Sequence, residues 1–100
     1  MTKLFISQPM RGLSEEEIFR RRVELKTKAQ TILDDEVELL DSYFVNAPLS
    51  SSPLWYLGRS LQILSSADVA MFAKDYQDAR GCKIEYDCAL AYNIPTIIEE

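Results

Sequence analysis

The sequence predicts a three-layer α/β fold, in which a parallel sheet of about four strands is covered by helices on both faces. Three observations support this prediction. Short apolar segments alternate along the chain with segments whose apolar residues recur at helical spacing. The apolar segments are nearly continuous, as in strands that are buried on both sides. The 100 residues suit a single domain, residues 1–100, and the alternation favours right-handed βαβ crossovers within it.

The first half of the chain is expected to contain two strands and one helix. The strands are predicted at residues 3–7 and at about 36–41. Between them, Ser14 and Glu17 have the spacing of a capping box, which starts a helix that runs to about Leu33. The apolar residues expected on the inner face of this helix are Ile18, Leu25, Ala29 and Ile32.

The second half repeats the alternation twice. Ser52 and Pro53 are typical of the first positions of a helix. A third strand is predicted at residues 67–73, and a fourth at 94–98 after a helix that Asn93 ends. The apolar stripe of the helix after Pro53 is expected to consist of Leu54, Leu57, Leu61 and Leu64.

The expected strand order is 2-1-3-4, as in flavodoxin-like and Rossmann-like sheets. The connections then change direction between strands 1 and 3. Ligands of such sheets bind at this switch point, beyond the carboxyl ends of the strands. The two loops that meet there are residues 7–13 and 74–81, so the functional site is predicted between them.

Composition excludes several classes of function. The net charge of −5 argues against a duplex nucleic acid partner, which would require a basic surface. The chain has no histidine, so the usual proton shuttle and the commonest metal ligand are both missing. We expect no metal and no organic cofactor. Cys82 and Cys88 are expected to be reduced core residues. No signal peptide or transmembrane run is visible, so a cytoplasmic protein without a membrane partner is expected.

Glu85 lies where the helix before the fourth strand should be apolar. At about 100° per residue it falls between Tyr92 and Ala89, on the half of the helix that also carries Ile84 and Cys88. On this wheel Ala91 and Cys82 also face inward, whereas Tyr86 and Leu90 face outward.

Three interpretations of Glu85 are open. The helix could be rotated so that the carboxylate is solvated, or Glu85 could be a structural partner of Arg80 or Arg11. In the third interpretation, Glu85 is a functional carboxylate in a partly apolar pocket. A carboxylate in a site without histidine suits glycosidic chemistry, in which it attacks or stabilises an oxocarbenium-like carbon.

The loop after the first strand, "SQPMRG", is a candidate anion site. It precedes a helix N-terminus, where backbone N–H groups favour anions, and Arg11 could add a bidentate contact to a phosphate or carboxylate. The alternative is a polar turn in which Gly12 supplies a positive φ angle.

Two further features carry weaker predictions. The run Arg20–Arg22 is expected to form a solvated face that pairs with Glu16, Glu17 and Glu24. The connection at residues 42–52 is longer than usual. The aromatic residues that flank it could form a lid or stacking wall for a flat base, or equally a subunit interface; they are Tyr43, Phe44, Trp55 and Tyr56.

Three segments carry a family resemblance: "LFISQPMRG", "SSADVAMFA" and "DARGCKIEYDCALAYNIPTII". Together they resemble the nucleoside 2-deoxyribosyltransferase-like superfamily, and most closely its short bacterial and phage branch of unassigned function. The resemblance covers about residues 3–98. The third segment is similar to the one that carries the nucleophilic glutamate of the family, and this glutamate matches Glu85.

The resemblance implies cleavage or transfer at the N-glycosidic bond of a nucleoside or nucleotide. Glu85 would be the catalytic nucleophile, and Asp78 would assist the leaving base. It also implies a homodimer or larger assembly, because family sites often borrow residues from a neighbour. The residues expected to bind the substrate are Ser7, Gln8, Met10, Arg11, Gly12, Ser60 and Gly81.

The chain departs from the family pattern at several positions. Ser60 stands where many active members carry an aspartate near the sugar, and Lys83 and Asp87 replace glycines on either side of Glu85. Asp78 is displaced by one position. The missing aspartate favours a rival function, a module that binds or senses a nucleotide without cleaving it. A second rival is a structural or interaction protein of a phage or mobile element.

Overall fold

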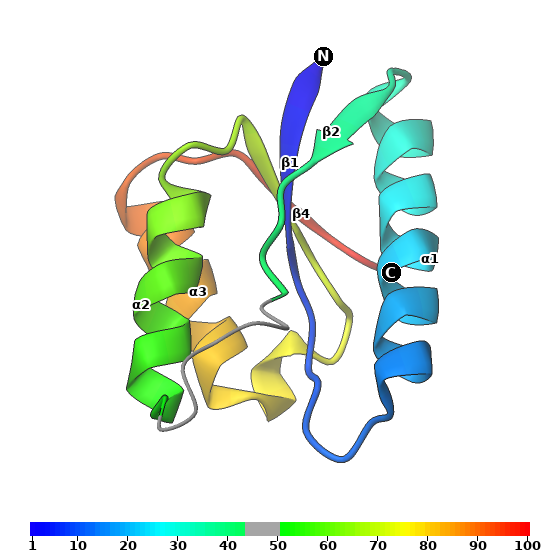
Figure 1. The fold of residues 1–100 in the computed structure, drawn as a ribbon. Helices are drawn as coiled ribbons and strands as arrows, with labels where there is room; N and C mark the ends of the chain where they lie inside the picture. The colour runs from blue at the N-terminus through cyan, green and yellow to red at the C-terminus, as the bar shows by residue number, and fades with distance from the viewer. Residues whose placement is uncertain (44–50) are drawn as a thin grey trace.

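The computed structural model describes residues 1–43 and 51–100, so Phe44 and most of the long 42–52 connection lie outside the described residues. The sheet has four parallel strands in the order β2-β1-β3-β4, which confirms the predicted fold class and strand order (Figure 1). The strands are β1 (Thr2–Ser7), β2 (Val37–Leu39), β3 (Val69–Phe72) and β4 (Thr96–Ile98).

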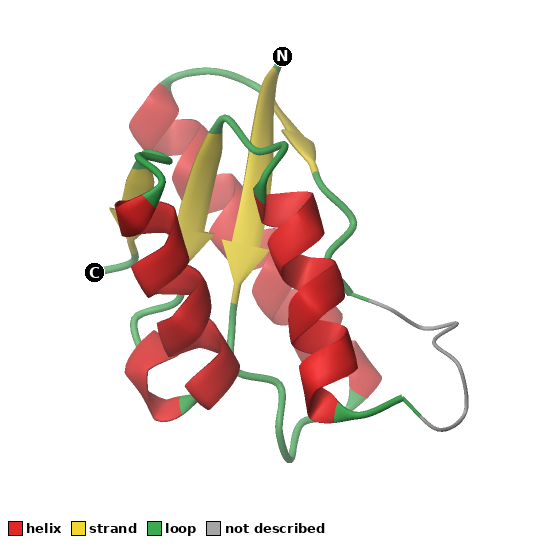
Figure 2. Cartoon of the chain, turned by 90° about the vertical axis from the view of Figure 1, so that its left-hand side faces the viewer, coloured by secondary structure: helices red, strands yellow, loops and turns green. Residues whose placement is uncertain are grey.

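The helices form a layer on each face of the sheet. The helix α1 (Glu15–Leu33) covers one face, and α2 (Pro53–Leu64) and α3 (Arg80–Ala91) lie together on the other (Figures 1 and 2). A short 3-10 helix, η1 (Tyr76–Asp78), lies in the loop between β3 and α3, where the sequence predicted only a loop.

The predicted helix starts are confirmed. Ser14 Oγ accepts a hydrogen bond from the backbone N–H of Glu17 at 3.1 Å, and the Glu17 side chain accepts one from the backbone N–H of Ser14. Ser52 caps α2 by accepting from the backbone N–H of Trp55, with Pro53 in the first turn. Asn93 follows α3 with a φ of 60°, a left-handed conformation that stops the helix.

The inner face of α1 differs from the prediction at two positions. Ile32 is 60% exposed, although it was expected to be buried. Arg22 is buried, although it was expected to be solvated. The reason is the helical period, because Ile18 and Arg22 continue at steps of three or four through the buried Leu25 and Ala29 to the partly buried Leu33.

The apolar stripe of α2 is buried only at its carboxyl-terminal end. Leu64 is buried and Leu61 packs beside it, but Leu54 is 74% exposed, against the prediction. Leu54 lies about 15 Å from Leu64 along the helix axis, since a helix rises about 1.5 Å per residue. The helix packs mainly against α3, so its first turn buries little.

The orientation of α3 is rotated from the predicted wheel. Tyr92 is 79% exposed and Ala91 is also exposed, although both were expected to face inward. Tyr86 was expected to face outward, but it packs against the core. The residues of α3 that are buried are Cys82, Glu85 and Ala89.

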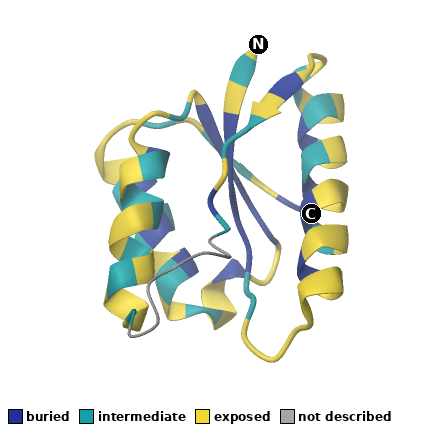
Figure 3. Cartoon of the chain, viewed as in Figure 1, coloured by how far each residue is buried: buried dark blue, intermediate teal, exposed yellow. Residues whose placement is uncertain are grey.

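The described residues form two core clusters, one on each face of the sheet (Figure 3). Leu4 and Ile6 of β1 face α1, whereas Phe5 faces α2 and α3 together with Phe72 of β3. The alternation of side chains along a strand therefore sends Ser7, the last residue of β1, toward α3.

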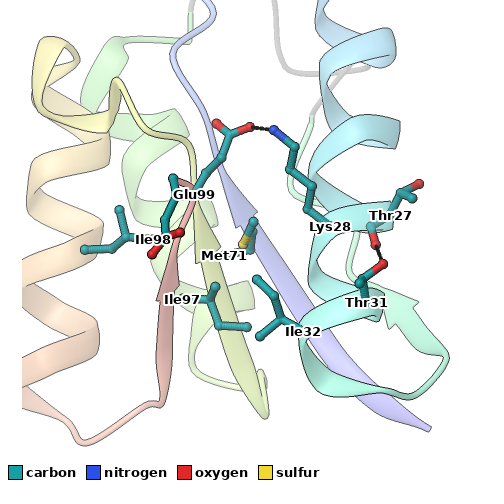
Figure 4. Close-up of a pocket in the computed structure, with 9 residues that line it drawn as sticks. Thr27, Lys28, Thr31, Ile32, Met71, Ile97, Ile98 and Glu99 are labelled. Atoms are coloured by element: carbon teal, nitrogen blue, oxygen red, sulfur yellow. Dashed lines mark hydrogen bonds and ion pairs between the residues drawn. The ribbon is translucent and has the colours of Figure 1, made fainter.

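A buried carboxylate ties the end of β4 to α1. Glu99 accepts hydrogen bonds from Arg21 and Lys28 of α1, and from the backbone N–H of Lys74 at 3.0 Å. Figure 4 shows Lys28 and Glu99 joined above a groove of about 570 Å³ beside β4, which Ile32 and Ile97 help to line. No pattern in the sequence predicted the burial of Glu99.

Candidate functional site

Glu85 lies at the predicted edge of the sheet and is 8% exposed. It sits in the second turn of α3, facing the carboxyl end of β1. The hydroxyl Oγ of Ser7 donates to Glu85 Oε1 at 2.6 Å, so the last residue of β1 holds the carboxylate directly. The helical period places Glu85 on the buried side of α3, and the fold brings that side to the end of β1. The contact therefore joins two residues that are 78 positions apart in the sequence.

Burial and hydrogen bonding act on Glu85 in opposite directions. Burial raises the pKa of Glu85 to about 6, while hydrogen bonds from Ser7 and Ser60 oppose the rise. A pKa near 6 leaves most of the group ionised at neutral pH, although little water reaches it. The site therefore holds a poorly solvated carboxylate between two hydroxyl groups from different elements.

These contacts exclude two of the three earlier interpretations of Glu85. The interpretation of a rotated helix with a solvated carboxylate is wrong, because Glu85 is buried. Among the residues that the structure describes, Glu85 also forms no ion pair with Arg80 or Arg11, which was the second interpretation. Within the described residues, the ion pairs do not include Glu85, and its carboxylate accepts a hydrogen bond from the Ser7 hydroxyl.

Cys82 lies one turn before Glu85 and is buried. Burial raises the pKa of the Cys82 thiol to about 11, and the Glu85 charge adds to the rise. The thiol is therefore protonated at neutral pH and is not a nucleophile. Cys82 and Cys88 are both free, as expected of core residues.

The fold separates Gln8 from Glu85 across the sheet. Gln8 is 2% exposed, and its Nε2 donates to the backbone oxygen of Ile18 in α1 at 3.2 Å. Within the described residues, its Oε1 has no hydrogen-bond partner. Gln8 is next to Ser7 in sequence, but it points toward α1.

The remaining residues of the predicted "SQPMRG" site lie in a turn. The backbone N–H of Leu13 donates to the oxygen of Met10 at 3.1 Å, and Gly12 has a φ of 82°. Arg11 and Gly12 are exposed and Met10 is half-buried. This geometry agrees with the alternative of a polar turn with a positive φ at Gly12, and it leaves the anion contact of Arg11 as a prediction.

The residues predicted on the other loop lie around the start of α3. Asp78 ends η1 and is exposed, and Gly81 is half-buried in the first turn of α3. Thus Ser7, Ser60 and Glu85 meet in one place, whereas Gln8 faces the other side of the sheet.

The predicted aromatic wall is divided between elements. Tyr43 packs edge to face against Phe19 of α1, with ring centroids 5.1 Å apart. Trp55 and Tyr56 contact each other on α2, with centroids 5.2 Å apart. The lid and the subunit interface both remain predictions.

Two buried charged residues were missed by sequence reasoning. Arg22 lies at helical spacing from the buried Ile18 and Leu25, where an apolar core residue is expected. This spacing is the signal that could have predicted its burial. Glu99 follows the apolar fourth strand directly, but its partners are distant in sequence, so no local pattern marks it.

The described residues hold neither a cluster of metal ligands nor a helix that could span a membrane. No group of three or more His, Cys, Asp or Glu residues in 1–43 and 51–100 is arranged to hold a metal ion. In the same ranges, every helix is too short or too polar to cross a membrane.

Comparison with known proteins gives structural matches only. No family model and no curated protein sequence matches the chain. A conserved protein from Enterococcus faecalis V583 has a similar structure, with a TM-score of 0.69 and 17% identity, over 98% of this chain and 62% of that one. A 2-deoxyribosyltransferase from Bacillus psychrosaccharolyticus matches with a TM-score of 0.63 and 17% identity, over 96% of this chain and 70% of that one.

These likenesses show a shared fold. The chain spans less than two thirds of the length of the Enterococcus faecalis protein and about 70% of the transferase. The transferase is described as a biocatalyst for the synthesis of nucleosides, and that description applies to the transferase alone.

Proposed function

We propose that this protein cleaves or transfers at the N-glycosidic bond of a nucleoside or nucleotide, with Glu85 as the nucleophile. The observation that carries the proposal is the buried Glu85 carboxylate, held by Ser7 at the carboxyl end of β1. A ligand site is expected at this end of a parallel sheet. The structural likeness to a 2-deoxyribosyltransferase and the resemblance of the segment around Glu85 both support the proposal.

The proposed reaction has two steps. A carboxylate oxygen of Glu85 bonds to the anomeric carbon while the bond from that carbon to the base nitrogen breaks, and Asp78 or a water supplies a proton to the leaving base. A second base, or a water that gives a proton to Asp78, then attacks the same carbon and releases the Glu85 carboxylate. The Ser7 hydroxyl holds the carboxylate, and Ser60, Gly81 and the loop of Met10, Arg11 and Gly12 would contact the sugar or a 5′-phosphate.

A direct test is to incubate the protein with nucleosides and nucleoside monophosphates and to follow free base by chromatography. We expect the wild type to release base from at least one substrate and Glu85→Gln to release none. Asp87→Asn is a matched control, because Asp87 is an exposed carboxylate two positions further along the same helix. If Glu85→Gln releases base within threefold of wild type, the nucleophile assignment is wrong.

A second function is a module that binds a nucleotide without cleaving it. The observation that favours it is Ser60, because the side chain that α2 presents to Glu85 is a hydroxyl and not a second carboxylate. In that case, a nucleotide would raise the melting temperature of the protein, and chromatography after hours of incubation would recover it intact.

A further inference from the structure

Besides Glu85 and Glu99, a third charged residue among those described is buried, on the face of the sheet that α1 covers. Arg22 of α1 is 5% exposed. Its Nη1 donates to Ser42 Oγ at 3.3 Å, and its Nη2 donates to the backbone oxygen of Leu40 at 3.2 Å. Ser42 Oγ in turn donates to the backbone oxygen of Ile6. A guanidinium has five N–H donors, so these contacts leave capacity for another acceptor.

The charge of Arg22 is not paired with an anion at close range. Within the described residues, the ion pairs at 4.0 Å or less do not include Arg22, and residues 44–50 contain no Asp or Glu. Burial lowers the pKa of Arg22, and the charge of Asp41 opposes this from a longer distance. Because a buried charge without a close partner is costly and Asp41 compensates Arg22 only in part, the position favours an additional anion.

A groove of about 300 Å³ lies beside Arg22, between α1 and the end of β2. This volume is at the small end of ligand sites, so it suits one ring or one branched aliphatic group. The rings of Phe19 and Tyr43 stand edge to face in its wall, at 85° to each other. Besides Arg22, the groove is lined by Phe19, Val23, Leu39, Leu40, Asp41 and Tyr43.

We propose that this groove binds a small monocarboxylate with an apolar body. The carboxylate accepts hydrogen bonds from Arg22, whose planar guanidinium matches a carboxylate in a bidentate arrangement. The apolar body packs against Phe19, Tyr43 and Val23. Asp41 also lines the groove, and its negative charge disfavours a second charge on the ligand, so a monoanion is preferred to a phosphate ester dianion.

This site does not depend on the proposed glycosidic function. Arg22 reaches the sheet from α1, whereas Glu85 reaches it from α3 on the other face. A ligand in the groove therefore needs no contact with Glu85, and Glu85→Gln should leave its binding unchanged.

Phenylacetate is a suitable probe, with 2-phenylethanol as the neutral molecule of the same shape and phenyl phosphate as the dianion. In a titration followed by amide NMR, phenylacetate should give saturable shifts confined to residues 19–23 and 39–43. It should bind about tenfold or more tightly than either comparison compound, as expected of a hydrogen bond to a charged group. Absence of saturation at millimolar phenylacetate, or equal binding of 2-phenylethanol, overturns the proposal.

Two variants connect the binding to the groove. Arg22→Gln should weaken phenylacetate about tenfold or more, and Arg20→Gln should not, because Arg20 is an exposed arginine on the same helix. Val23→Trp fills the groove and leaves the Arg22 hydrogen bonds in place, so it should abolish binding of phenylacetate. It tests the location of the site even if Arg22→Gln fails to fold. Unchanged binding by Val23→Trp, or loss of binding by Glu85→Gln, contradicts a site in this groove.

Discussion

Among single residues, Glu85 and Glu99 show how differently the fold treats two buried carboxylates. Glu85 receives hydroxyl donors only, and its pKa rises to about 6 because burial outweighs them. Glu99 receives two cationic side chains and a backbone N–H, and the Arg21 hydrogen bond leads in lowering its pKa to about 2. Glu85 is therefore the group whose charge is poorly compensated, as a nucleophile requires, while Glu99 stabilises the structure.

Replacing Glu85 by glutamine should stabilise the protein at neutral pH. The pKa of Glu85 rises from 4.5 to about 6 on folding, so the folded state binds more protons between these values. The free energy of unfolding must then fall as pH rises through this window and stay lower above it. Glu85→Gln should raise the free energy of unfolding at pH 7 by up to about 2 kcal/mol. This value follows from the shift in pKa at about 1.4 kcal/mol per unit.

Urea unfolding at pH 7 and pH 4 measures this effect. The advantage of Glu85→Gln should disappear at pH 4, where wild-type Glu85 is protonated, and Asp87→Asn serves as the exposed control on the same helix. A variant that is clearly less stable than wild type at pH 7 would mean that the Glu85 charge stabilises the fold.

Any base release that depends on Glu85 should also depend on its charge. The protonated carboxyl cannot attack the anomeric carbon, so the rate should fall about tenfold per pH unit below about pH 6. A pH–rate profile of kcat/KM on the first active substrate measures this fall. A rate that stays level down to pH 4.5 would contradict an ionised Glu85 as the nucleophile.

Replacing Glu99 by glutamine should destabilise the protein at neutral pH. Its pKa is lowered on folding, so the stability it contributes is complete above pH 4.5 and is lost as pH falls toward 2. We expect Glu99→Gln to lose about 2–3 kcal/mol at pH 7. Denaturation with Glu100→Gln as the exposed neighbouring control checks this, and equal stability of the two variants would show that the network contributes little.

At the scale of elements, α1 and α2 differ in how they contact the core. The buried side of α1 runs along the helix from Ile18 to Leu33 without interruption, with Arg22 included. The helix α2 is buried only near Leu64, and its first turn carries the exposed Leu54. The carboxyl-terminal end of α2 therefore contributes most of its packing energy.

Alanine substitutions at the two ends of α2 should differ strongly in effect. Leu64→Ala removes a side chain that is 2% exposed and should cost about 2–4 kcal/mol. Leu54→Ala removes the same atoms from an exposed position and should cost less than about 0.5 kcal/mol. Urea midpoints compare the two directly, and similar losses would show that the first turn of α2 is also packed.

For the whole molecule, the sequence predicted the topology but not every orientation. The alternation of elements and the handedness of crossovers limit a parallel sheet to a few strand orders, and the predicted one is among them. The rotation of α3 depends on contacts outside the helix, because Tyr86 packs against Phe72 of β3 and Tyr76 of η1. The inward position of Glu85 was predicted because a glutamate interrupts the apolar side of the helix. Its hydrogen bond with Ser7 could be identified only from the folded structure.

We predict that the protein self-associates through α2 and the long connection before it. Leu54 and Tyr56 expose apolar surface on the first turns of α2. Sedimentation at micromolar concentration should give at least a dimer. Leu54→Lys should weaken the association, whereas Ile32→Lys, on the exposed side of α1, should not. A monomer at this concentration would contradict the prediction.

The short strands at both edges of the sheet set an order of amide exchange with deuterated solvent. β1 and β3 are central and pair on both sides, whereas β2 and β4 have three residues each and pair on one side. Amides of Phe5, Ile6 and Met71 should exchange only when the whole molecule unfolds, and those of β2 and β4 through smaller local openings. Local opening should thus begin at both edges of the sheet and reach β1 last. The hydrogen bond between Ser7 and Glu85 should therefore persist when β2 and β4 have already opened.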